Sequence, residues 1–487
     1  MKLLLKIFGI LFLGYGALLL GAHAFEILAF RINGIQASDL DYNTYRTPDP
    51  DPSSNFYSVL EYDFSPSNRA LPYSPKGLQD HFPVPGVMGK KTQGNSLPWP
   101  WNPDFSLFFD PQTIANDGLE RIKESGSNFP EKMPDLRAIS AAKTPQEVCE
   151  VLVSPFHPFL NRLCSGLASP ESINPLPYPN LVNLDTPQLG VMDLIRTAKL
   201  MALESLLGLG HNPPRMSVEP ILVNLRLAQG LLDRPIYMIN HIAGLAITGI
   251  TLPVIWKGCE ASALATEDLI RISKQLAKLD PVKNSATSIM SNYSELYQIL
   301  LKTDRPLLSC IKREGILGPI LIPFWRGLLV LEVAKIKDAL GQKTEFKTGK
   351  EVFQKNWQIS HFPFPGVSKM MTYYNETAKQ ALLIKLASLD LTLELYRRKT
   401  GFLPESLGQL VPGLCRKLPL DPFSGKNFGY KKTGPNEFIL YSSWVDQKDD
   451  GGTPLQIPNP PPPNMGEFLF FEAKGDFVWP QHHAGKN

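Results

Sequence analysis

A regular stripe of apolar residues near the C-terminus is the feature of this chain that most constrains its fold. Six residues recur there at spacings of four and three positions: Ala378, Leu382, Leu386, Leu389, Leu393 and Tyr396. These spacings match the 3.6 residues per turn of an α-helix, so the pattern predicts one long helix that buries this face. Gly401 follows a basic last turn and marks the helix end, because glycine readily adopts the left-handed conformation found there.

The charged residues of this predicted helix lie off the stripe, and we expect them on its polar side. They are Lys379, Lys385, Asp390, Glu394 and Arg397. Glu394 and Arg398 are four positions apart, which is a spacing at which opposite charges pair along a helix.

The pattern changes from helical to extended after this helix. Pro404 opens a second, short helix over 405–411, and 421–425 has the composition of a turn. Side chains then alternate in character over 428–430 and again over 438–442, with a Gly-Pro-Asn sequence between the two runs. Two alternating runs joined in this way predict an antiparallel pair of strands.

Three carboxylates follow within five residues. They are Asp446, Asp449 and Asp450, and Gly451 and Gly452 come directly after them. Such carboxylates repel one another unless they are solvated, protonated or bridged by a cation. Calcium takes several oxygen ligands, and a flexible glycine-containing loop can wrap it. The spacing is not that of an EF-hand, so a calcium loop and a solvated acidic loop both stay open.

The order of these motifs resembles the globular C-terminal part of the major pseudopilins of type II secretion. The matching segments lie within 376–480 and read LYRRKTGFLPESLGQLV, LPLDPFSGKNFGY, FILYSSWVD followed by DDGG, and DFVWP. The C-terminal region and the helical middle are also similar to a family of membrane-anchored bacterial proteins of the planctomycete and verrucomicrobia type. The resemblance implies a compact α+β module, and it implies no reaction.

In pseudopilins the loop after the last strand holds a calcium ion, and the resemblance carries this role to the acidic loop. Asp446 takes the place of the family's first loop aspartate. Asp449 or Asp450 takes that of the second, with the backbone of Ser442 and Ser443 nearby.

The chain departs from the pseudopilin pattern in three ways. It shows no prepilin leader, and the module's helix begins near 376 rather than at the N-terminus. We therefore do not expect the protein to polymerise as a pilus subunit. A proline-rich stretch, 457–464, interrupts the closing segment, so we expect Asp476 and Trp479 to be displaced relative to the family pattern.

Composition bounds the rest of the chain. Its 487 residues, 43% hydrophobic and 20% charged, suit a globular protein of two or three domains. The net charge of +3, without a run rich in Lys or Arg, gives no support for nucleic-acid binding. We divide the chain into an N-terminal anchor or signal peptide (1–30), a proline-rich irregular segment (31–134), an α-helical domain (135–370) and the pseudopilin-like module (371–487).

The first residues form a targeting segment. Two lysines precede an apolar run over 7–22, and the Ala-His-Ala sequence at 22–24 fits a signal-peptide cleavage site. Apolar residues resume beyond it, broken only by Glu26, so a helix over 3–30 is long enough to span a bilayer with the lysines inside. An uncleaved membrane anchor and a cleaved signal peptide both stay open. Either one places the bulk of the chain outside the cytoplasm.

Helical periodicity dominates the middle of the chain between proline and glycine breaks. The predicted helices cover 188–207, 219–232, 235–257, 266–279, 286–302 and 324–340. Short connections imply antiparallel pairs packed as a helical bundle or short solenoid. The predicted fold class is therefore mostly α with a C-terminal α+β pseudopilin-like module. We interpret the apolar segment 239–255 as a core helix rather than a membrane span, because it contains His241 and Pro253.

Motifs for catalysis are few. The chain contains no HExxH, GxSxG, P-loop or CxxC sequence. We interpret His241 as a hydrogen-bonded core residue rather than a base. Of the five cysteines, Cys149 with Cys164 and Cys259 with Cys310 are conceivable disulfides in an oxidising compartment, and buried free thiols are the alternative.

These observations favour an exported, membrane-tethered protein that binds or scaffolds other components of the cell envelope. Its expected partners are the membrane and an envelope protein, its only expected cofactor is calcium, and we expect no catalytic residues. An extracytoplasmic enzyme, such as a hydrolase with a site in the helical domain, is the alternative. An accessory of the secretion apparatus is a third option. A polar cleft with converging His, Asp or Glu side chains would favour the enzyme.

Overall fold

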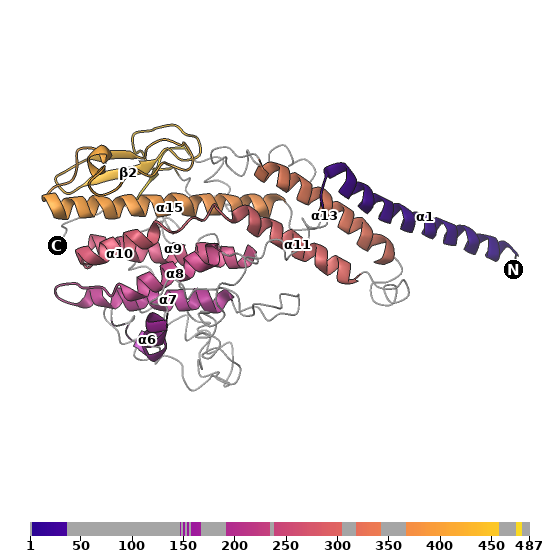
Figure 1. The fold of residues 1–487 in the computed structure, drawn as a ribbon, viewed down its shortest axis with the longest axis horizontal. Coiled ribbons are helices and arrows are strands. Elements are labelled where there is room, and N and C mark those ends of the chain that lie inside the picture. The colour runs from indigo at the N-terminus through magenta and orange to yellow at the C-terminus, as the bar shows by residue number, and fades with distance from the viewer. Residues whose placement is uncertain are drawn as a thin grey trace.

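The protein is mostly helical and carries one small antiparallel sheet (Figure 1). The computed structural model describes residues 2–36, 147, 150, 153–154, 157–166, 191–233, 238–303, 318–341, 367–456 and 474–479. The helices are α1 (Lys2–Asn33), α6 (His157–Gly166), α7 (Val191–Leu207), α8 (Glu219–Asp233), α9 (Met238–Glu260), α10 (Thr266–Leu276), α11 (Ser285–Thr303), α13 (Gly318–Gly341) and α15 (Val367–Thr400). Two 3-10 turns, η9 (Gly208–Gly210) and η11 (Leu407–Leu410), and three strands, β1 (Gly429–Lys432), β2 (Phe438–Ser442) and β3 (Phe477–Val478), complete the elements.

The helices of the middle region lie close to their predicted positions, because their apolar periodicity reflects real burial. The exception is α13, which begins at Gly318 instead of 324. Pro323 suggested a break, but the helix continues through it, with Pro323 as its sixth residue. Most of the predicted proline-rich segment, 31–134, lies outside the described residues.

The helix α9 lies at the centre of the helical body. It packs against α7, α8 and α15. Its composition would suit a membrane span, but 72% of its apolar window is buried inside the protein. The prediction of a core helix is therefore confirmed.

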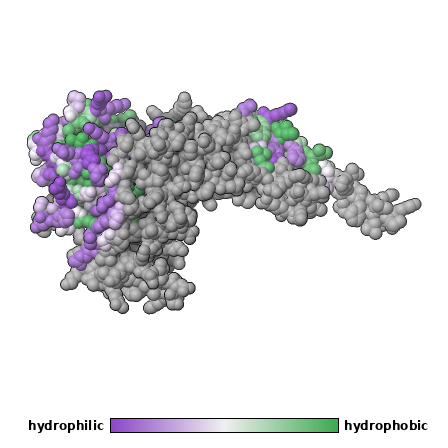
Figure 2. Space-filling view, turned by 60° about the horizontal axis from the view of Figure 1, so that its bottom comes forward, coloured by the Kyte–Doolittle hydropathy of each residue, from purple (hydrophilic) through white to green (hydrophobic). Residues whose placement is uncertain are grey.

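Two apolar helices form an arm that leaves this body. In Figure 1, α1 lies beside α13, and the N-terminus marks the free end of the arm. The end of the helix α11 also lies in the arm and packs on α13. Figure 2 shows apolar side chains gathered on the described surface of the arm, beside a smaller hydrophilic group.

The helix α15 is buried on two opposite sides. One side carries the predicted stripe, of which Ala378, Leu382, Leu386, Leu389 and Leu393 are buried. The small sheet covers one side of α15, and α9 and α10 cover another (Figure 1). Because of this double cover, Lys379 and Asp390, which we expected on a polar side, are buried too. The Lys379 Nζ lies 2.5 Å from a carboxylate oxygen of Glu376.

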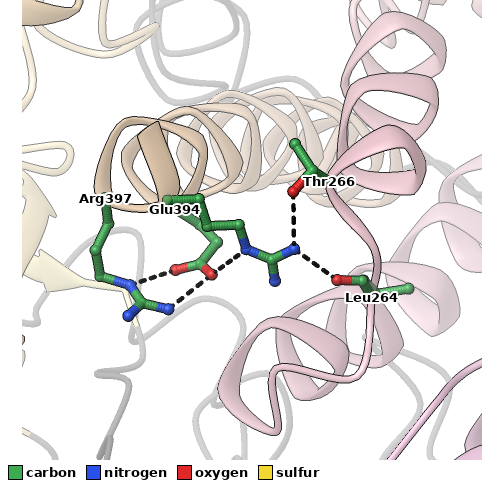
Figure 3. A network of polar contacts seen from close by, with 5 residues as sticks. Leu264, Thr266, Glu394 and Arg397 are labelled. Carbon is green, nitrogen blue, oxygen red and sulfur yellow. Dashed lines mark hydrogen bonds and ion pairs between the residues drawn. The ribbon is translucent and has the colours of Figure 1, made fainter. Parts of the chain in front are cut away.

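Near its C-terminal end, α15 is joined to the loop before α10 by a polar network (Figure 3). Glu394 accepts hydrogen bonds from Arg397 at 2.8 Å and from Arg398 at 2.7 Å, which confirms the predicted pairing with Arg398. Arg398 also donates to the carbonyl of Leu264 at 2.8 Å. Burial alone would raise the pKa of Glu394, but the hydrogen bonds from the two arginines outweigh it and lower the pKa. The carboxylate therefore stays charged inside the joint.

The sheet confirms the predicted hairpin and adds a third strand. Its order is β1-β2-β3, with Tyr430 opposite Leu440 and Ser442 opposite Phe477. The predicted short helix over 405–411 is present only as the 3-10 turn η11. The rings of Phe423 and Phe477 pack on that of Trp444, and all three side chains are buried.

The closing segment of the chain returns to this sheet. Trp479 donates from its indole nitrogen to Asp390 of α15 at 3.1 Å, and its backbone N–H donates to Leu440 of β2. Both Asp476 and Trp479 are thus built into the module. The proline-rich stretch before them, 457–464, lies outside the described residues. Whether the module shares the pseudopilin fold stays a prediction.

Candidate functional site

A buried ion pair joins the arm helices. The carboxylate of Glu26 in α1 accepts a hydrogen bond from Arg326 in α13 at 2.8 Å and a second from the hydroxyl of Tyr297 in α11 at 3.1 Å. Glu26 is 8% exposed and Arg326 4%. Charges are seldom buried to this extent unless they are paired, because removing each from water is costly. The pair therefore ties α1 to two helices that lie far from it in the sequence.

Close packing surrounds this pair. The ring of Phe25 lies 5.3 Å from that of Phe324, and the ring of Phe30 meets Tyr297 edge-on at 5.9 Å. A Cβ atom at Gly327 would lie 2.6 Å from the Phe25 ring, so only glycine allows α13 to approach α1 this closely. The segment of α1 around Glu26 is therefore fitted to α13 in shape as well as in charge.

This junction bears on the two interpretations of the targeting segment. The candidate cleavage site after Ala24 lies inside α1, which runs without a break from Lys2 to Asn33. Ala22 is already buried in the arm. Cleavage would create a charged amino group at Phe25, against the apolar ring of Phe324.

The acidic loop of the C-terminal module holds its predicted residues in separate contacts. Asp446 accepts from the backbone N–H of Lys448 at 3.1 Å, and Asp450 pairs with the Lys448 side chain. Asp449 accepts from the Tyr441 hydroxyl at 3.0 Å. Burial first, and then the hydrogen bond to Asp449, raise the pKa of Tyr441 to about 12. Each of the three carboxylates thus contacts Lys448 of the loop or Tyr441 of β2.

Sequence reasoning did not assign Asp476 to this loop. It is fully buried directly before β3, and its Oδ2 accepts from the N–H of Gly452 at 2.7 Å. Its Oδ1 has no hydrogen-bond partner of good geometry among the described residues. Burial raises the pKa of Asp476, and the carboxylates of Asp449 and Asp450 raise it further, although the amides of Gly452 and Asp450 oppose the rise. Only its place before the last strand could have pointed to it.

The loop fits a calcium ion in part. Asp449, Asp450 and the buried Asp476 supply oxygen atoms of the kind that calcium prefers. However, no group of three or more His, Cys, Asp or Glu residues in the described ranges is arranged to hold a metal ion. The calcium role of Asp446, Asp449 and Asp450 therefore stays a prediction, and Asp476 joins the set to be tested.

His241 is a core residue, as predicted. Its Nε2 lies 3.0 Å from the carbonyl oxygen of Pro281, and its Nδ1 lies 2.8 Å from the Tyr373 hydroxyl. A carbonyl only accepts, so Nε2 carries the proton and Nδ1 accepts from Tyr373. Burial lowers the pKa of His241 to about 4, although the bond to Pro281 opposes this. The ring is therefore neutral at physiological pH and has no access to solvent.

A second histidine gives the hydrolase alternative its nearest candidate. His157 of α6 lies 3.0 Å from the carboxylate of Glu204 in α7, and both are partly exposed. No serine, threonine or cysteine in the described segments hydrogen-bonds to His157. Burial, and then the charges of Glu219 and Glu204, raise the pKa of the neighbouring Cys164 to about 11. This thiol therefore stays protonated and is a weak nucleophile.

The cysteines that the structure describes are free thiols. These are Cys164, Cys259 and Cys415. Burial raises the pKa of Cys259 well above its ordinary value, as expected for a small core residue. The suggested partners Cys149 and Cys310 lie outside the described residues.

Comparisons with protein-family models, with curated proteins and with solved structures find no match for this chain. The likeness to pseudopilins therefore stays an interpretation of the sequence motifs.

The burial of His241 predicts a specific pH dependence of stability. Below pH 6.5 the unfolded chain takes up a proton that the folded ring refuses until about pH 4. The free energy of unfolding should therefore fall as the pH drops from 6.5 towards 4, by on the order of 3 kcal/mol. In His241→Gln this contribution should vanish, because glutamine does not titrate.

Urea unfolding of the full-length protein in detergent micelles at a series of pH values measures this difference. His211→Gln, which alters an exposed histidine, is the matched control and should keep the wild-type profile. Equal pH profiles for His241→Gln and the wild type would contradict the assignment.

The Glu26–Arg326 pair predicts a contrast between single and double substitutions. Glu26→Gln should lower the free energy of unfolding by about 3–5 kcal/mol, because Arg326 would keep a buried charge without its counter-charge. Glu26→Leu combined with Arg326→Met should recover most of this loss. Thermal unfolding followed by circular dichroism in micelles compares the variants, and a double variant no better than Glu26→Gln would show that the loss is one of shape rather than charge.

Proposed function

We propose that this protein is an exported scaffold or binding protein of the cell envelope, tethered to the membrane by α1. The observation that carries the proposal is the junction at Glu26. The described part of α1 includes Gly14–Asn33, an apolar stretch long enough to cross a membrane and mostly exposed. Glu26 within this stretch nevertheless ties α1 to the folded body through Arg326 and Tyr297. A helix of this kind is suited to hold the body at the membrane surface.

The chemistry of the body supports binding rather than catalysis. The two groups that most resemble catalytic residues by type are His241 and Cys164. His241 is buried with both ring nitrogens hydrogen-bonded, and burial keeps the Cys164 thiol protonated near pH 7. The pair of His157 and Glu204 has no nucleophile among the residues that the structure describes. An envelope protein is the expected partner of the body.

We also propose that calcium stabilises the C-terminal module through Asp449, Asp450 and Asp476. The buried Oδ1 of Asp476 and the raised pKa of this carboxyl support the proposal, since a cation would satisfy the oxygen and offset the repulsion. Binding would require Lys448 to leave Asp450. Asp446, which the sequence motif places first in the loop, contributes a further oxygen.

The tether predicts that the mature protein keeps its N-terminal helix. Intact-mass measurement of the protein purified from membranes should give the full-length chain, because cleavage would cut α1 beside its buried ion pair. The protein should also stay in the membrane fraction after alkaline extraction, which removes peripheral proteins. A mature chain that begins at Phe25 and is released by alkali would overturn the tether.

The calcium proposal predicts that calcium raises the melting temperature of the full-length protein and that a chelator reverses the rise. Asp476→Asn should abolish the response, and in chelator it should melt no lower than the wild type, because it removes a carboxyl that resists ionisation. Asp446→Asn should weaken the response less than Asp476→Asn does. Equal melting temperatures of the wild type in calcium and in chelator would leave a solvated acidic loop.

A further inference from the structure

The first turns of α13 are apolar throughout. Residues 318–325 read GPILIPFW, and the first charged residue of the helix, Arg326, is neutralised by Glu26. The next charge in the helix is at Glu332, and further charged residues follow. Leu321 and Phe324 are 42% and 38% exposed in the arm. This end of α13 therefore presents apolar side chains that no described element covers fully.

The same end of α13 points towards the free end of the arm. The helix α11 starts in the body, where Ser285 follows the loop that contacts His241, and it reaches Glu26 of α1 through Tyr297. The helix therefore leads outward, and α13 returns towards the body beside α1 (Figure 1). Because Arg326 is level with Glu26, residues 318–325 lie beside the part of α1 that precedes Glu26.

The length of α1 indicates where the Glu26–Arg326 pair lies relative to a bilayer. The helix has 32 residues, and at 1.5 Å per residue it is about 48 Å long. The hydrocarbon core is about 30 Å thick, or about 20 helical residues. Counted from Lys6, the last lysine before the apolar run, about 20 residues reach Glu26. The ion pair then lies at the outer boundary of the hydrocarbon.

Aromatic residues gather at the level of the Glu26–Arg326 pair. The rings of Phe25, Phe30, Tyr297 and Phe324 surround the ion pair, and Trp325 lies next to Phe324. Tyrosine and tryptophan are enriched where a membrane protein crosses the boundary between lipid and water. This cluster is independent of the residue count, and it indicates the same boundary.

We propose that the first two turns of α13, residues 318–325, insert into the outer leaflet beside α1, so that two helices hold the protein in the bilayer. The inference rests on the proposed tether and goes beyond a single-pass anchor. A segment of eight residues is too short to span the membrane, and it enters one leaflet only. A second inserted segment adds apolar area to the membrane contact and limits tilting of the body about α1.

Photolabelling from inside the bilayer tests the proposal with the unmodified protein. The full-length chain is reconstituted in phosphatidylcholine vesicles that contain a phosphatidylcholine with a diazirine on its acyl chain, then illuminated, digested and mapped by mass spectrometry. We expect lipid adducts on α1 and on 318–325. The peptide containing Ile270 of α10, which is as exposed as these side chains at 39%, should carry none.

The outcomes separate this inference from the proposed function. Adducts on α1 alone would overturn the insertion of α13 and leave the tether intact, whereas absence of adducts on α1 would overturn the tether itself.

A charged variant sharpens the test. Leu321→Glu, which alters an exposed side chain, should lower the yield of adducts on α13 severalfold and leave that on α1 unchanged, because a carboxylate is costly to place in hydrocarbon. Ile270→Glu is the matched control and should change neither yield. Since the wild-type map stands without any substitution, a variant that fails to fold would not decide the result. Unchanged α13 labelling in a folded Leu321→Glu variant would overturn the insertion.

Discussion

The rest of the structure depends on the burial of α15 from two sides. The helix gives one face to the sheet and others to α9 and α10, so the C-terminal module and the helical body share a single element. Leu382, Leu386 and Leu393 are fully buried by this arrangement, and even Asp390 is enclosed, where it accepts a hydrogen bond from Trp479. Because each layer covers a face that would otherwise be exposed to water, neither layer is complete without the other.

The local structure could be predicted well from the sequence, since it depends on short-range periodicity. The spacing of apolar residues predicted the helices of the body and the hairpin of β1 and β2. The prediction was wrong for two charged residues that we expected on a polar side of α15. Lys379 and Asp390 lie off the single apolar stripe, and we therefore placed them on a polar side. The local sequence does not indicate that a second layer covers that side of the helix.

The candidate sites show the same limit more strongly. The acidic loop was visible because Asp446, Asp449 and Asp450 lie together in the sequence, but Asp476 joins them across a separation of 24 residues from Gly452. Glu26 appeared only as an interruption of an apolar segment, and nothing near it indicated Arg326. Such pairings result from the topology of the chain. A carboxylate in an apolar helix is nevertheless a signal in itself, because a buried charge requires a partner somewhere.

The distance between these two charges along the chain has a consequence for biosynthesis. Arg326 follows Glu26 by 300 positions, so at a synthesis rate of roughly 5–20 residues per second the carboxylate precedes its partner by on the order of 15–60 s. During that interval Glu26 is hydrated, and α1 has no fixed neighbour. The arm therefore assembles long after its first residues are made, and a nascent chain halted before α13 would leave α1 without Arg326.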